Sequence, residues 1–360
     1  MFTIFVFFIV LSILVIIHEA GHFIAAKLNG IKVEEFGFGL PPRVFGFHIG
    51  ETLYSLNALP FGGFVKVLGE EEEELTGKKL SKEDLGRAFS RKRSWQKIMV
   101  LVAGVTCNFL LGWFIMSYLF TRGVPVPSEI VSVEEVVSNS PAEKAGLLKG
   151  DKIRSMQFNE TVETIESTEE LTAFAKAHGD EEITLTVQRG EGNISLSIIP
   201  RKNPPAGQGA LGLVISNYEI KKYSITEAPL LGLTESVKMT KLIFTEFSKT
   251  LFRFVTFQKQ EAEIAGPVGI ARLTSAAARQ GMDALLQMIG LLSLNLAVIN
   301  ILPFPALDGG RLALVLYEMI SRRKVNPNIE RKLNMAGFAF LLSLIALVTV
   351  NDIIKLIKGL

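Results

Sequence analysis

Cysteine is nearly absent from this chain. Cys107 is the only one in 360 residues, and it lies in an apolar stretch. The sequence therefore excludes an intrachain disulfide and a zinc site built from cysteines. The net charge is only +2, with 38 basic and 36 acidic residues, so the composition gives no case for nucleic-acid binding. Histidine is also scarce, at four residues, and a site made of imidazoles has few candidates.

Charged residues are rare in four long apolar segments: the first has none from Phe2 to Ile17, and the other three have none at all. Each is close to the length needed to cross a hydrocarbon core of ~30 Å at 1.5 Å per residue. The segments are Phe2–Lys27, Ile98–Phe120, Ala284–Leu302 and Met335–Val350, the last extending towards Leu360. The sequence thus predicts a polytopic α-helical membrane protein with about four transmembrane helices. The first segment lacks a basic leader and a cleavage site, so we expect it to be retained.

Positive charge predicts the orientation of these helices. A basic run, Arg91–Lys97, precedes the second segment, and six Lys and Arg residues lie between the third and fourth. Four crossings place both loops on one side, which the positive-inside rule makes cytoplasmic. The termini and the long stretch Arg122–Gly281 are then extracytoplasmic. A chain that enters at Phe2 reaches His18 after ~24 Å of helix, in the cytoplasmic half of the membrane.

The first apolar segment contains His18-Glu19-Ala20-Gly21-His22. Two histidines four residues apart lie on one helix face and can bind one zinc ion, and the glutamate is placed to handle a water proton. Polar side chains in lipid are costly without partners, which favours a functional pair over packing residues.

A catalytic zinc site needs a third protein ligand and an open fourth position. His48 lies in a loop and His178 lies in the outer segment across the membrane, so both are poor candidates. Asp308 follows the helix-breaking Pro303 and Pro305 at the cytoplasmic end of the third segment, at the depth predicted for His18. The sequence favours Asp308 as the third ligand.

The long outer stretch has the pattern of a small α+β domain. Ser140 precedes a short helix that ends in Ala145-Gly146-Leu147, and Gly150-Asp151 leads into a strand. Thr168–His178 has helical periodicity, and Ile183–Val187 and Ile194–Ile198 alternate like a hairpin. A late strand is expected at Leu211-Gly212-Leu213. These features resemble a circularly permuted bacterial PDZ domain over Ser128–Ser216; a generic β domain is the alternative.

Four domains follow from this organisation. Residues 1–126 form an N-terminal transmembrane catalytic half, 127–217 the PDZ domain, 218–280 an amphipathic helical connector, and 281–360 a C-terminal transmembrane half. Thr226–Phe257, within the connector, is amphipathic and lies either on the membrane surface or against the PDZ domain.

Two motifs together resemble the site-2 protease family of intramembrane zinc metalloproteases. They are the His-Glu-x-x-His of the first segment and the Asn-x-x-Pro-x-Pro-x-Leu-Asp-Gly that runs from Asn300 to Gly309. Phe61–Lys66 and Gly266–Ala271 also match, and the similarity extends over almost the whole chain. The bacterial branch that activates envelope-stress sigma factors is the most similar, although some of its members carry two PDZ domains and this chain has room for one.

The resemblance implies a set of roles. His18, His22 and Asp308 bind Zn²⁺, and Glu19 is the general base. Asn295 and Asn300 hold the substrate backbone, while Gly62 and Gly63 belong to a membrane re-entrant β-hairpin that pairs with an unwound substrate strand. The family's Gly-Pro-x-x-Asn occurs as Gly104-Val105-Thr106-Cys107-Asn108, without its proline, so a substrate role for Asn108 is weaker.

The family also implies partners and a location. We expect site-2 cleavage of single-span membrane proteins, such as anti-sigma factors or remnant signal peptides, after trimming by a site-1 protease. The expected location is the bacterial inner membrane, in contact with lipid, with the PDZ domain extracytoplasmic. That domain either excludes substrates with intact outer domains or binds a newly exposed C-terminus, and we prefer the first.

Two other functions compete. One is a membrane adaptor in which a structural zinc ties two helices and the PDZ domain recruits partners; it needs a closed zinc shell and no Glu19. The other is a metalloprotease for soluble or lipidated chains, as in prenyl processing, for which a glutamate is expected in place of Asp308.

Overall fold

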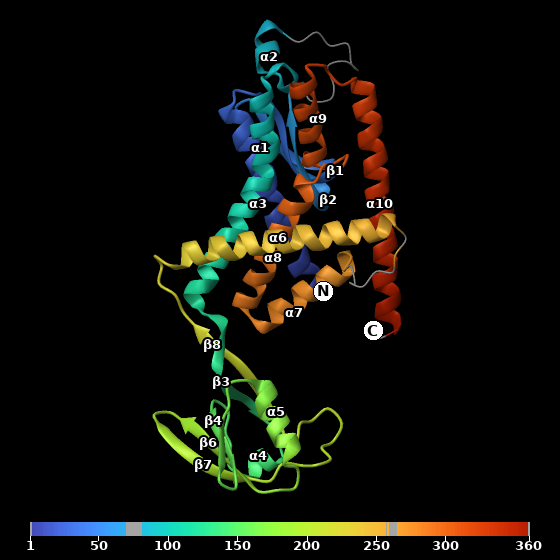
Figure 1. Ribbon diagram of the computed structural model, residues 1–360. Helices are drawn as coiled ribbons and strands as arrows, with labels where there is room; N and C mark the ends of the chain where they lie inside the picture. Colours follow the sequence, from blue (N-terminus) through green and yellow to red (C-terminus); the bar gives the residue numbers. More distant parts are fainter. Residues whose placement is uncertain (1, 70–80, 257, 259–264, 359–360) are drawn as a thin grey trace. The chain divides into compact units, whose positions relative to one another are not determined.

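A computed structural model describes residues 2–69, 81–256, 258 and 265–358. The chain divides into two compact units. The helical unit comprises residues 1–121 and 224–360, and the sheet unit comprises residues 122–223 (Figure 1).

Four helices of the helical unit are long and apolar enough to cross a membrane. They are α1 (Phe2–Leu28), α3 (Ser94–Arg122), α8 (Met282–Ile301) and α10 (Pro327–Lys358). This confirms the four predicted segments. The last helix starts earlier than expected, at Pro327, since proline suits the first turn of a helix.

Helix α1 buries one narrow face. Val10, Leu14 and His18 follow one another at intervals of four residues and are all buried, whereas Ile9, Ile13 and other large apolar residues are exposed. A spacing of four keeps side chains on one side of a helix. The first histidine of the metal motif therefore points into the protein from a helix whose other faces suit lipid.

A tight turn joins α8 to α9 (Asp308–Ser321). The predicted helix break at Pro303 and Pro305 is confirmed, but α9 itself was not anticipated. A Cβ atom on Gly309 would lie 2.2 Å from the carbonyl oxygen of Leu302, and one on Gly310 would lie 2.3 Å from that of Phe304. Only glycine fits both positions, and the turn sets Asp308 at the first position of α9.

The first loop forms a two-stranded antiparallel sheet from β1 (Val33–Ile49) and β2 (Thr52–Val67). Both strands are bent, so each contributes two segments to the pairing. Residues 33–38 pair with residues 63–67 on one side and with residues 53–57 on the other. Residues 53–57 also pair with residues 43–49. Residues 63–67 thus form an edge: within the described part of the chain, no strand pairs with their outer side. Edges of this kind can accept another strand.

Glu51 anchors this sheet to the neighbouring helices. Its Oε1 accepts hydrogen bonds from Arg87 at 2.6 Å and from Lys27 at 2.8 Å. These partners lower the pKa of Glu51 to about 2, so the carboxylate is ionised at any physiological pH.

The remaining elements of the helical unit are shorter or lie across the others. They are α2 (Lys82–Arg87), the 3-10 helix η1 (Phe89–Arg91), α6 (Ala228–Val255) and α7 (Pro267–Gln280). In Figure 1, α6 runs across the direction of α3 and α10. The Trp113 indole N–H donates a 2.8 Å hydrogen bond to the carbonyl oxygen of Pro229, which ties α6 to α3.

Asp352 of α10 holds the beginning of α7. Its carboxylate accepts a 2.8 Å hydrogen bond from the backbone N–H of Gly269, and it is only 8% exposed. A Cβ atom on Gly266 would lie 2.8 Å from Asp352 Oδ2. The glycines of the Gly266–Ala271 motif thus leave space for a carboxylate at a helix N-terminus, where the dipole favours it.

The sheet unit is an antiparallel sheet in the order β7-β6-β4-β3-β8, with β5 paired to β4. Its elements are β3 (Val124–Val136), α4 (Pro141–Lys144), β4 (Lys152–Phe158), β5 (Thr161–Thr164), α5 (Thr168–Ala177), β6 (Ile183–Arg189), β7 (Gly192–Ile198) and β8 (Leu213–Lys221). The core contains Val131, Ile153, Met156, Leu171, Ile183, Leu185 and Val187. The Ser140-capped helix, the helix from Thr168 and the hairpin are confirmed. The late strand lies further along than predicted: β8 begins at Leu213, the last of the three predicted residues, because Gly212 has a positive φ of 72° that does not suit a strand.

Candidate metal centre

Three side chains from two distant parts of the sequence meet in the helical unit. Asp308 Oδ2 lies 3.0 Å from His18 Nε2 and 3.2 Å from His22 Nε2, and the two Nε2 atoms are 3.1 Å apart. The side chains of His18, His22 and Asp308 are 11%, 12% and 22% exposed. Ligands at 2.0–2.1 Å around a tetrahedral zinc are about 3.3 Å apart, so this donor set fits zinc.

Helix α3 lies directly behind the two imidazoles. His22 donates from Nδ1 to the carbonyl oxygen of Val100 at 2.8 Å, which leaves its Nε2 lone pair for a metal. His18 Nδ1 lies 3.3 Å from Asn108 Nδ2. A Cβ atom on Gly104 would lie 2.3 Å from His22 Nε2, so only glycine lets α3 come this close.

Glu19 lies beside the cluster and against the edge of the sheet. Its carboxylate interacts electrostatically with His18, His22 and Asp308 and hydrogen bonds with the backbone of Val65. A Cβ atom on Gly63 would lie 3.2 Å from Glu19 Cγ. The carboxylate therefore faces both the three donor atoms and the backbone of residues 63–67.

The two asparagines of α8 have different surroundings. Asn300 Nδ2 is 3.5 Å from His18 Nε2, so this amide borders the cluster. Asn295 instead donates from Nδ2 to the carbonyl oxygen of Leu291 on its own helix, at 2.9 Å. Gly62, in β2, has a positive φ of 81° and lies one residue before Gly63.

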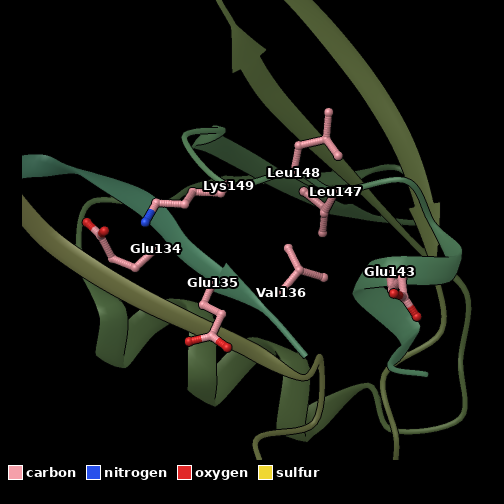
Figure 2. A pocket seen from close by; sticks show the side chains of 7 residues that line it. All are labelled: Glu134, Glu135, Val136, Glu143, Leu147, Leu148 and Lys149. Carbon is pink, nitrogen blue, oxygen red and sulfur yellow. The ribbon is translucent and has the colours of Figure 1, made fainter. Parts of the chain in front are cut away.

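The other two histidines do not join the cluster. His48 was predicted in a loop but lies in β1, where it pairs with Leu53. His178 Nδ1 lies 3.0 Å from Glu181 Oε2 in the sheet unit. The sheet unit also has a shallow pocket of about 390 Å³, lined by both charged and apolar side chains (Figure 2). Its lining residues are Glu134, Glu135, Val136, Glu143, Leu147, Leu148 and Lys149, none of which belongs to the cluster.

Comparison with known proteins agrees with this geometry. Residues 6–344 match peptidase family M50. The chain belongs to peptidase family M50. The zinc metalloprotease RasP of Shouchella clausii is 32% identical over 430 residues, which span 98% of this chain and 99% of the relative. The regulator of sigma-W protease RasP of Bacillus subtilis is 29% identical over the same shares, and a Clostridium perfringens relative is 36% identical over 95% of this chain and 96% of its own.

Membership of M50 settles the class of activity. This M50 protein is a membrane zinc metalloprotease of the site-2 type, as its motifs predicted, and the adaptor alternative is wrong. The four apolar helices agree with an enzyme that works in the membrane.

The contacts of α3 with the two histidines are not apparent from the sequence. The carbonyl of Val100 has no side-chain signature, so nothing in the sequence marks it as the partner of His22. Gly104 and Asn108 did leave a signal, because two residues four apart lie on one face of α3. The sequence did not show that this face contacts the histidines.

Proposed function

We propose that this M50 protein hydrolyses peptide bonds in the transmembrane segments of single-span membrane proteins, with His18, His22 and Asp308 as zinc ligands and Glu19 as the general base. The observation that carries the proposal is the convergence of three ligand atoms within 4.8 Å, from α1 and the start of α9. Two neutral imidazoles and one carboxylate leave a fourth position open, as catalytic zinc sites require.

The residues around the cluster have separate tasks in hydrolysis. Zinc, when bound, supplies a Lewis acid that lowers the pKa of a water molecule and polarises the scissile carbonyl. Glu19 takes the proton of the attacking water and passes it to the leaving amine nitrogen, so the carboxylate ends the cycle in its starting state. The amide of Asn300 is placed to donate to a substrate carbonyl beside His18.

The edge at residues 63–67 is the proposed substrate-binding strand. A helical substrate has its peptide groups in internal hydrogen bonds, so a scissile segment must unwind before attack. An edge strand next to Glu19 can pair with the freed backbone by strand addition. We propose that β1 and β2 form a re-entrant hairpin, supported by its exposed Val44, Phe45, Phe47 and Ile49.

The proposed location is the bacterial inner membrane, with the active site near the cytoplasmic side. The basic residues around Arg91 and between α8 and α10 support this orientation. The sheet unit is then extracytoplasmic. Because a relative is named for the regulation of sigma-W, we propose anti-sigma factors as substrates, trimmed beforehand by a site-1 protease.

We further propose that the sheet unit is a circularly permuted PDZ domain that acts as a gate. Its order of strands and helices and the Gly150-Asp151 turn before β4 support the PDZ assignment. A bulky domain next to the membrane obstructs substrates whose own outer domains are intact. This accounts for a preference for substrates that have been trimmed.

Mapping the cut bond tests the proposed function. The full chain is reconstituted in liposomes with a panel of single-span segments, each with and without a folded outer domain, and the products are identified by mass spectrometry. We expect cuts within the apolar segments and faster cleavage of the trimmed forms. Cuts confined to flanking soluble sequence would contradict the proposal.

A further inference from the structure

Asn108 is wholly buried on α3, next to His18. Its Nδ2 lies 3.3 Å from His18 Nδ1, while its Oδ1 is buried without a hydrogen-bond partner among the described residues. The exposed fraction of Asn108 is 0%. Burying an amide oxygen without a partner is unfavourable, so this residue has an unused acceptor directly beside a proposed metal-binding histidine.

The chemistry of the imidazole determines which amide atom must face it. A histidine that binds zinc through Nε2 carries its proton on Nδ1, and that N–H needs an acceptor. His22 meets this requirement with the carbonyl of Val100. For His18 the neighbouring group is the Asn108 amide, and an NH₂ group there would favour the tautomer whose Nε2 is protonated and cannot bind metal.

We propose that Asn108 is a positioning residue whose Oδ1 accepts the hydrogen bond of His18 Nδ1–H and so holds His18 in its zinc-binding tautomer. The oxygen and nitrogen of an amide are nearly the same size, so a half-turn about the last side-chain torsion exchanges them in place. This side-chain rotation places the unpaired Oδ1 of Asn108 beside His18 Nδ1, which becomes its hydrogen-bond donor. The inference rests on the proposed zinc ligands.

The surroundings of Asn108 hold it in this place. Ser293 of α8 is fully buried, and its Oγ donates a 2.7 Å hydrogen bond to the carbonyl oxygen of Asn108. A Cβ atom on Gly104, one turn earlier, would lie 2.7 Å from His18 Cε1, so α3 is in close contact with the ring. Asn108 therefore lies on the Nδ1 side of His18, whereas Asn300 borders its Nε2 side. In this proposal Asn108 positions a zinc ligand and does not have the substrate-contacting role that the sequence predicted.

Two substitutions separate an acceptor from a donor at this position. Asn108→Leu removes the acceptor, and we expect zinc affinity to fall about 10- to 100-fold, the usual cost of losing a partner of a metal-binding histidine. Asn108→Asp keeps only acceptors, so it should retain zinc at least as well as the parent. Asn295→Leu is the matched control, because that amide donates to its own helix, and its zinc affinity should equal that of the parent.

The readout is zinc affinity of the purified full chain by competition with a chromophoric chelator, which requires no substrate. Parent-like affinity in Asn108→Leu would overturn the inference, and so would zinc loss in Asn108→Asp as large as in Asn108→Leu. Since Asn108→Asp tests the same hydrogen bond, the inference remains testable if the leucine variant fails to fold. A parent chain that binds no zinc would instead overturn the proposed ligand set itself.

Discussion

At the scale of single residues, the proposed metal site consists of three side chains that the helices bring within hydrogen-bond distance. His18 and His22 share a face of α1, and Asp308 reaches them from the first turn of α9. Their donor atoms lie 3.0–3.2 Å apart. Two neutral imidazoles and one carboxylate at such distances can direct their lone pairs at a single cation.

The first prediction concerns these ligands. Replacing His18, His22 or Asp308 with alanine should weaken zinc binding by more than about 100-fold. This exceeds the loss expected when a residue that hydrogen-bonds to a zinc ligand is removed. His48→Ala and His178→Ala are matched controls from outside the cluster and should retain one zinc per chain. Elemental analysis after dialysis measures both groups. Equal zinc in His22→Ala and His48→Ala would refute the ligand assignment.

Part of this site could be predicted from the sequence because its signals are local. A spacing of four residues places His18 and His22 on one helix face whatever the rest of the chain does. Asp308 could be predicted because its expected depth in the membrane equals that of His18. That depth follows from the helix rise per residue and from the positive charge of the loops. The contact between Asn108 and His18 joins residues 90 positions apart through the crossing of α1 and α3, and no sequence period encodes that crossing.

At the scale of the elements, the edge formed by residues 63–67 of β2 is the proposed substrate-binding strand. Gly63 brings the backbone of this edge against Glu19, and an added Cβ atom would lie 3.0 Å from Val15 Cγ1 and 3.2 Å from Glu19 Cγ. Gly63→Ala should therefore push the edge away from α1 and lower kcat for a transmembrane substrate, with zinc content unchanged. Gly86→Ala is the control, since nothing lies within 4 Å of its Cβ position.

Comparison of Gly63→Ala with Gly86→Ala tests whether the substrate pairs with residues 63–67. A misplacement of about 1 Å in a reacting segment can cost about 100-fold in rate. The close contacts at Gly63 call for a smaller shift, so a smaller but clear loss is expected in Gly63→Ala alone. Steady-state cleavage of a reconstituted single-span substrate gives the comparison. If Gly63→Ala and Gly86→Ala cleave at the same rate, residues 63–67 do not position the substrate.

The second element-scale prediction concerns the turn before β4. Asp151 is almost fully buried and accepts hydrogen bonds from Arg189 Nε at 2.8 Å, Arg189 Nη2 at 2.7 Å and the Leu148 N–H at 2.9 Å. The Arg189 guanidinium holds the pKa of Asp151 below its ordinary value. The stabilisation is therefore complete above the ordinary carboxyl pKa of about 3.9 and is lost as the pH falls through the lowered value.

Asp151→Asn should destabilise the sheet unit by about 1.5–3 kcal/mol at pH 7. Hydrogen exchange of the β4 and β6 amides, compared between variant and parent at the same pH, cancels the intrinsic exchange rates. We expect exchange about 10- to 100-fold faster in the variant at pH 7, approaching the parent well below pH 4. A ratio near one at pH 7 would show that Asp151 does not hold the turn.

Some of these helices and strands could be predicted from sequence patterns, and others could not. The hairpin β6–β7 and the helix α5 have clean periods and caps and were predicted closely. Helix α9 was missed because it begins Asp308-Gly309-Gly310, and paired glycines disfavour helix. Those glycines are required by carbonyl oxygens of residues 301, 302 and 304, which come near only in the folded chain.

At the scale of the whole molecule, the sheet unit is an insertion whose two ends meet. Val124 of β3 pairs with Lys221 of β8, so the chain enters and leaves the unit side by side. An insertion of this kind can be removed with a short linker and little effect on the remaining fold. His18, Glu19, His22 and Asp308 all belong to the helical unit.

Deletion of residues 128–216 tests the gate. We expect the shortened chain to cleave substrates with intact outer domains at a rate approaching that for trimmed ones, while the parent prefers the trimmed forms. The same deletion combined with Glu19→Gln controls for contaminating proteases. Loss of activity on trimmed substrates would count against a gate and in favour of a peptide-binding role.

Hydrolysis at the cluster, with Glu19 as the general base, is tested most directly by one variant. Glu19→Gln keeps the size of the side chain and removes its ability to take a proton. Zinc content and cleavage of a reconstituted single-span substrate should be measured on the same preparation. We predict one zinc per chain and turnover at least about 100-fold below the parent, as the loss of a general base entails. Parent-like turnover in Glu19→Gln with zinc bound would contradict it.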